Sequence, residues 1–182
     1  GLEGYSEEQL LDHARAIGES IPIFGFYLQP AAGGRRLSYA FWRAFAEIPA
    51  VGAIKVAAFN RYATLDVVRA VCSSSRRDEI TLYTGNDDNI LADLLTPYRF
   101  SIGGQRVEKR FAGGLLGHWA VWTECAVRLL AAVQAFRKGP LRVTDTGQPA
   151  ADDWLAMGAA VTDMNAALFD AANGFKGCIP GV

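Results

Sequence analysis

The sequence predicts an α/β fold built around a parallel sheet, and more specifically part of a (β/α)8 TIM barrel. Strand and helix patterns alternate along the chain, and the strands are apolar runs without the alternation of a half-exposed strand. The strand-to-strand repeat is nearly constant, with 28 residues from Tyr27 to Lys55 and 30 from Lys55 to Gly85. A doubly wound open sheet is the alternative, although no GxGxxG motif follows a predicted strand.

The first half of the chain contains three helix patterns and two strand patterns. Ser6 and Ser38 are suited to cap helices, because apolar residues recur at helical spacing behind each of them. The runs IPIFGFYL (21–28) and VGAIKVA (51–57) are apolar and rich in β-branched or aromatic residues, which predicts buried strands. Leucine and valine at helical spacing then predict a helix over 62–72.

The second half continues the alternation and adds a hairpin. The run ITLYTG predicts a strand over 80–85, and the run AGGLLGHW predicts another over 112–119. Two adjacent glycines in an alternating stretch predict a small hairpin over 100–111. Helices are expected over 87–95, 120–136 and 151–172, the last after a loop with two glycines and two prolines.

Composition excludes several classes of protein. The 182 residues are half apolar and a fifth charged, which suits one globular unit with a sizeable core. The net charge is −1 and the basic residues are scattered, so no nucleic-acid surface is expected. The three cysteines are widely spaced, so no metal site is predicted. No run is long enough to span a membrane and nothing marks export, so we expect a cytoplasmic protein.

A lysine in the middle of an apolar strand is the first candidate catalytic residue. Lys55 lies in VGAIKVAAF, and removal from water favours a neutral amine that can attack a ketone to form a Schiff base. The alternative is a lysine that reaches solvent or pairs with Asp87 or Asp88. Tyr27 lies one strand earlier, and we expect its hydroxyl beside Lys55, where it would shuttle protons.

Four segments resemble, in order and spacing, the second half of the dihydrodipicolinate synthase and N-acetylneuraminate lyase family. They are GFYLQPAAGG, IPAVGAIKVAAFN, LYTGNDD and AGGLLG. The resemblance implies a class I aldolase or lyase without a cofactor, in which Lys55 forms a Schiff base with a 2-keto acid such as pyruvate. Tyr27 would relay protons, while Gly85, Asn86, Asp87 and Leu116 would contact the substrate.

The resemblance also implies how the chain is organised. Residues 1–138 would be strands five to eight of the barrel with their helices, and 139–182 part of a C-terminal helical extension. Such a piece would expose its interior, and we expect it to need its other half. The full-length form is expected to be a homo-oligomer, commonly a tetramer, with a small-molecule partner and no nucleic-acid or membrane partner.

Some positions depart from the family pattern or have competing interpretations. Where dihydrodipicolinate synthases have an arginine two residues after the motif proline, this chain has Ala32, which argues against that activity; Arg35 and Arg36 are expected at the surface. Asn86, Asp87 and Asp88 suit binding of sugar hydroxyls, although an aspartate at this place is also an ordinary helix cap. His118 is either an acid–base group or structural. A protein that binds a metabolite without turnover remains the alternative function.

Overall fold

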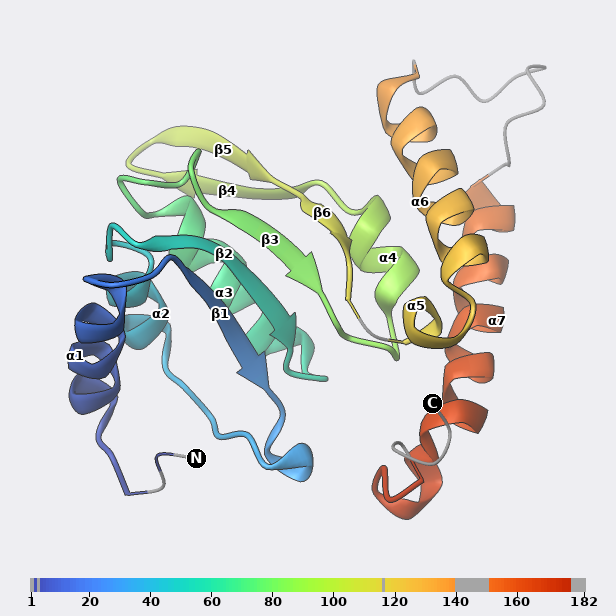
Figure 1. The fold of residues 1–182 in the computed structure, drawn as a ribbon. Helices are drawn as coiled ribbons and strands as arrows, with labels where there is room; N and C mark the ends of the chain where they lie inside the picture. Colours follow the sequence, from blue (N-terminus) through green and yellow to red (C-terminus); the bar gives the residue numbers. More distant parts are fainter. Residues whose placement is uncertain (1, 3, 116, 140–150, 178–182) are drawn as a thin grey trace. The chain divides into compact units, whose positions relative to one another are not determined.

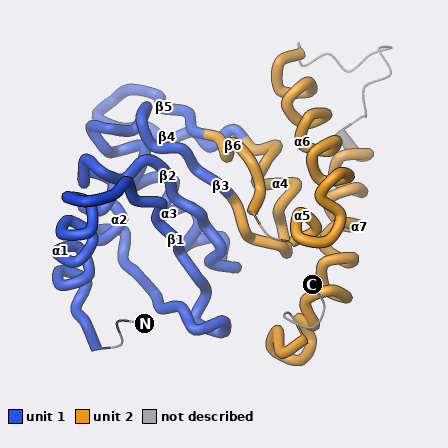
Figure 2. Tube along the Cα trace, in the orientation of Figure 1, with its two compact units in different colours: residues 1–83, 97–109 blue, residues 84–96, 110–182 orange. Residues whose placement is uncertain are grey.

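The computed structural model describes residues 2, 4–115, 117–139 and 151–177 (Figure 1). They form two compact units (Figure 2). The first unit consists of Gly1–Tyr83 and Pro97–Lys109, and the second of Thr84–Thr96 and Arg110–Val182. The division predicted between residues 138 and 139 therefore falls inside the second unit.

The strands form a parallel sheet, as predicted. Its strands are, in spatial order, β1 (Ile23–Leu28), β2 (Val51–Ala57), β3 (Thr81–Thr84) and β6 (Phe111–Gly114). The mixed α/β class is thus confirmed. Within the described part of the chain the sheet has four strands and does not close on itself, so the TIM barrel stays a prediction.

Two helices of the first unit are capped by the serines that the sequence predicts, and the third by Asn60, which was not predicted. In α1 (Glu7–Gly18), the Ser6 hydroxyl accepts a hydrogen bond from the Gln9 amide, and the Gln9 side chain accepts one from the Ser6 amide, which makes a capping box. Ser38 caps α2 (Tyr39–Phe45) through the Phe41 amide. Asn60 caps α3 (Arg61–Cys72) through the Ala63 amide. These caps satisfy amides that the first helical turn leaves without partners.

One face of strand β1 packs against α2. A β-carbon at Gly25 would lie 2.6 Å from the Phe45 ring, so the absence of a side chain lets this ring approach the strand. Tyr27 contacts the Trp42 ring, with centroids 5.1 Å apart. The core of the unit is completed by aliphatic side chains from β2 and α3, which are fully buried: Val51, Ile54, Val56, Val67, Val68 and Val71.

The predicted hairpin is present in the first unit. Strands β4 (Tyr98–Ile102) and β5 (Gln105–Lys109) pair antiparallel with Ile102 opposite Gln105. Gly103 and Gly104 form the two-residue turn with φ of 56° and 79°, a combination that favours glycine at both positions. The two glycines therefore set the register of the hairpin.

The second unit is mainly helical. It contains α4 (Ile90–Leu95), α5 (His118–Val121), α6 (Thr123–Lys138) and α7 (Ala151–Phe169), together with β6. Helix α4 packs against α7 and against β6. The Trp154 ring of α7 contacts the Phe136 ring of α6, with centroids 5.4 Å apart.

Three predicted boundaries in this unit are wrong. Strand β6 ends at Gly114 instead of continuing to 119, and His118 begins a helix. The single helix predicted over 120–136 is two helices, because the backbone of Trp122 (φ −120°, ψ 58°) leaves the helical region. The last helix ends at Phe169, and Asp170 has a left-handed backbone before the short turn η2 (Ala171–Asn173).

Candidate functional site

Lys55 lies on the face of the sheet that bears exposed aromatic rings. It is the fifth of seven residues in β2, in the carboxyl-terminal half of the strand, and its side chain is half-buried. Its Nζ atom lies 4.4 Å from the centroid of the Phe26 ring of β1. The Phe26 side chain is 48 % exposed and the Phe24 side chain 50 % exposed, so this face is accessible to a small molecule.

The register of β1 and β2 explains which residues share this face. Phe26 pairs with Lys55, and Phe24 pairs with Ala53. Successive side chains of a strand point to opposite faces of the sheet. Phe24, Phe26, Ala53 and Lys55 therefore share one face, and Gly25 and its partner Ile54 lie on the other. An ammonium over an aromatic ring is attracted by the negative face of the π-system, which orients the Lys55 side chain.

The expected proximity of Tyr27 to Lys55 is wrong. Tyr27 pairs with Val56, one position beyond Lys55, and its side chain points to the face covered by α2. The ring is 4 % exposed, and its hydroxyl lies 3.4 Å from the Leu37 nitrogen and 3.5 Å from the Leu37 carbonyl oxygen. In this arrangement Tyr27 is a packing residue that anchors the chain before α2.

Another tyrosine, which the sequence reasoning missed, lies on the face that bears Lys55. The Tyr83 ring of β3 meets the Phe24 ring edge to face, with centroids 5.5 Å apart. The two rings come from strands on either side of β2, and Ala53, which pairs with Phe24, has a side chain small enough to let them meet. Leu82 and Thr84 are buried on one face of β3, so the alternation of side chains along the strand places Tyr83, between them, on the opposite face.

In the second unit, Asn86 belongs to a buried hydrogen-bond network. Its side-chain amide donates to Oδ2 of Asp93 at 2.9 Å, and the Thr84 hydroxyl donates to the same oxygen at 2.6 Å. All three side chains are fully buried. The network holds the turn after β3 against α4, and Gly85 lies buried within that turn. Substrate contacts by Gly85 and Asn86 stay predictions.

Asp87 is also buried, at 5 % exposure, and its carbonyl oxygen accepts a hydrogen bond from the Asn165 side chain of α7 at 3.0 Å. It is not the helix cap considered from the sequence, because the N-cap of α4 is Asn89. A β-carbon at Gly117 would lie 2.6 Å from Oδ1 of Asp87, so this glycine, with φ of 62°, leaves room for the carboxylate. Substrate binding by Asp87 stays a prediction. Leu116 lies outside the described residues.

The two histidines occupy contrasting environments. His13 is exposed on α1, as expected. His118 is 3 % exposed, its ring contacts Trp119, and neither ring nitrogen has a hydrogen-bond partner among the described residues. Burial lowers the pKa of His118, because the imidazolium form would lose its hydration. Burial therefore favours the neutral form of the His118 imidazole.

The arginine pair Arg35-Arg36 lies at the surface, and the Cys72 thiol is buried and unreactive. Arg35 and Arg36 are both exposed, as expected, and Arg35 donates to the Tyr5 carbonyl oxygen at 2.7 Å. Burial raises the pKa of the Cys72 thiol to about 11, so it is not a thiolate at neutral pH. Across the described residues, no cluster of histidine, cysteine and carboxylate side chains is arranged to hold a metal ion.

Comparison with known proteins found no similar protein. No protein-family model, curated protein or solved structure matches the chain. The resemblance to the dihydrodipicolinate synthase family therefore stays a prediction that rests on the four segments themselves. None of the helices in the described part of the chain has the length and apolar character needed to cross a membrane.

Proposed function

We propose that the protein is a Schiff-base-forming lyase or aldolase that acts on a 2-keto acid of the pyruvate type, with Lys55 as the nucleophile. The observation that supports this is the place of Lys55. Its amine lies over the Phe26 ring on an accessible aromatic face, towards the carboxyl end of a parallel strand. Ligands of parallel α/β sheets bind outside the carboxyl ends of the strands.

The proposed chemistry begins when the Lys55 ammonium loses its proton to water and the resulting amine attacks the keto carbon. Loss of water from the carbinolamine gives a protonated imine, which withdraws electrons from the neighbouring carbon. A proton then leaves that carbon, or a carbon–carbon bond to it breaks, and an enamine forms. Protonation of the enamine carbon, or its addition to an aldehyde, regenerates the protonated imine, and water then hydrolyses this imine to the free amine and a keto acid.

The proton transfers need a group on the same face as Lys55. Tyr27 points away from it, whereas Tyr83 is held on it through the contact with Phe24. We assign the relay to the Tyr83 hydroxyl, because a phenol can both accept and donate the proton that carbinolamine formation and collapse require.

A second candidate function is favoured by the orientation of Tyr27. With the hydroxyl of this residue held by Leu37, the lysine–tyrosine pair that the family resemblance implies is not assembled. A protein that keeps the parallel sheet and binds a metabolite without turnover is consistent with that arrangement. The homo-oligomeric state and the cytoplasmic location stay predictions under either function.

Reduction with borohydride in the presence of pyruvate separates the two functions. A Schiff base on Lys55 is reduced to a stable secondary amine, which mass spectrometry of the digested protein locates. We expect labelling of the peptide that contains Lys55, no labelling of it in Lys55→Arg, and unchanged labelling in Lys138→Arg. The last variant is the matched control, since Lys138 is the final residue of α6. Absence of label on Lys55 would remove the lyase proposal for this donor.

A further inference from the structure

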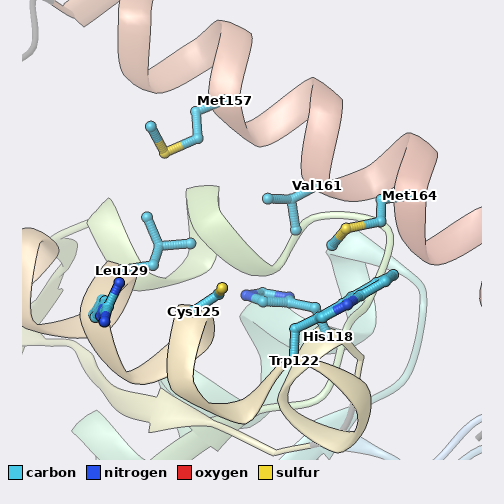
Figure 3. A pocket seen from close by; sticks show the side chains of 8 residues that line it. His118, Trp122, Cys125, Leu129, Met157, Val161 and Met164 are labelled. Atoms are coloured by element: carbon cyan, nitrogen blue, oxygen red, sulfur yellow. The ribbon is translucent and has the colours of Figure 1, made fainter.

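The second unit contains an apolar pocket that the proposed function does not use. It lies between α6 and α7 and has a volume of about 550 Å³. Trp122 and Cys125 line it from one side, and Met157, Val161 and Met164 from the other (Figure 3). The α7 residues are spaced four and three positions apart, so they lie on one face of that helix. A pocket of this size suits a small organic molecule.

One polar side chain projects into this apolar space. Figure 3 shows the His118 ring extending between the two helices, with Cys125 and Trp122 on either side of it in this view. His118 is 3 % exposed, and both of its ring nitrogens are shielded from water and have no hydrogen-bond partner in the part of the chain that the structure describes. A buried polar group without a hydrogen-bond partner destabilises the folded protein. A ligand that supplies the partner removes part of this destabilisation.

The imidazole restricts the chemistry of that ligand. A neutral imidazole has one donor and one acceptor nitrogen, and a hydroxyl group can satisfy either. A carboxylate is less suitable, because the arginine that lines the pocket, Arg128, pairs with Glu124. The His118 nitrogens are shielded in this structure, so a ligand reaches them only when a lining side chain moves; Trp122, which lines the same pocket, is 42 % exposed.

We propose that this pocket binds an apolar molecule with a single hydroxyl group, of the alkylphenol class, whose hydroxyl hydrogen-bonds to His118. The apolar body fills the space between Met157, Val161 and Met164. The sulfur atoms of methionine contact aromatic rings favourably, which suits an aromatic ligand.

The composition of the chain makes a direct test possible. Met157 and Met164 are the two methionines of the sequence, and both line the pocket. We would label methionine methyl groups with ¹³C and titrate the protein with 4-propylphenol or with propylbenzene, which differ in the hydroxyl. Both methyl signals are expected to shift in a saturable manner. The dissociation constant of 4-propylphenol should be about five- to tenfold lower, as one hydrogen bond of about 1 kcal/mol implies.

The same substitution at each of the two histidines isolates the hydroxyl contact. In His118→Phe, the two probes should bind with equal dissociation constants, whereas His13→Phe on the exposed face of α1 should keep the preference. If His118→Phe does not fold, the hydroxyl contact can be tested by NMR of the unmutated protein. The ¹⁵N signals of the His118 imidazole should move with 4-propylphenol and stay in place with propylbenzene.

Three results would overturn the proposal. They are no methyl shift with either probe, equal dissociation constants in the unmutated protein, and a preference for 4-propylphenol that persists in a folded His118→Phe variant. Tighter binding of 4-propylbenzoate than of 4-propylphenol would also overturn it, because it would show that the pocket selects an anion.

Discussion

The side chains of Tyr27 and Lys55, on neighbouring parallel strands, point to opposite faces of the sheet. Tyr27 packs on Trp42 and its hydroxyl lies near both main-chain polar atoms of Leu37. Lys55 lies over the ring of Phe26. The tyrosine thus supports the loop before α2, and the lysine lies with the aromatic side chains of the other face.

Replacement of Tyr27 by phenylalanine should reduce stability slightly and leave imine formation unchanged. The ring keeps its packing on Trp42, while two long contacts at 3.4 and 3.5 Å are lost. We expect a decrease of up to about 1 kcal/mol in the free energy of unfolding, measured in urea. The rate of borohydride-trappable labelling of Lys55 by pyruvate should stay within about twofold. A large loss of labelling in a variant of normal stability would restore Tyr27 as a proton relay.

Replacement of Tyr83 by phenylalanine should have the opposite pattern. The variant keeps the edge-to-face contact with Phe24 and loses the hydroxyl on the Lys55 face. If this hydroxyl relays protons, the rate of imine formation should fall by about tenfold or more, with little change in stability. Tyr39→Phe on α2 is the matched control and should react at the normal rate. Equal rates for the two variants would exclude Tyr83 from the relay.

The sequence predicts local structure well where a single residue type determines it. Gly103 and Gly104 predict the hairpin because a two-residue turn of this kind needs positive φ at both positions. Ser6 predicts the start of α1 because its hydroxyl replaces a missing helical partner. The parallel sheet follows from apolar strands alternating with helices.

The orientation of Tyr27 could not be predicted, because it depends on register. Ile23 pairs with Val51, an offset of 28 positions, and the same offset would pair Tyr27 with Lys55. The register shifts between Ile23 and Phe24, after which the offset is 29 and Tyr27 pairs with Val56. A one-residue shift moves a side chain to the other face of a sheet relative to its neighbour. Nothing in the residue types of this apolar run indicates that shift.

Replacement of Asp93 by alanine should strongly destabilise the protein. Thr84 and Asn86 donate to one of its oxygens in a fully buried network, so the substitution leaves two buried donors without this acceptor. We expect a loss of about 2–3 kcal/mol in the free energy of unfolding. Asp163→Ala removes an exposed carboxylate from α7 and should change stability by less than about 0.5 kcal/mol. Similar effects of the two substitutions in urea unfolding would show that the network contributes little.

The last prediction concerns Glu47, which joins the end of α2 to the loop after α3. Its carboxylate accepts hydrogen bonds from the Ser75 hydroxyl at 2.5 Å and from the Ser75 amide at 3.0 Å, and it pairs with Arg43. These interactions, the Ser75 hydroxyl foremost, lower the pKa of Glu47 from 4.5 to about 2. The ionised carboxylate of Glu47 is therefore more favourable in the folded state than in the unfolded state.

The sign of the resulting pH dependence follows from that lowered pKa. The stabilising contribution of Glu47 is fully present above its unfolded pKa of 4.5 and is lost as the pH falls towards about 2. Glu47→Gln should therefore be less stable than the unmutated protein at about pH 6, and the difference should shrink by about pH 3, in urea unfolding at both values. Glu19→Gln, which removes an exposed carboxylate after α1, serves as the control and should change stability little at either pH. A difference for Glu47→Gln that is the same at both pH values would mean that the contacts with Ser75 and Arg43 do not favour the ionised carboxylate.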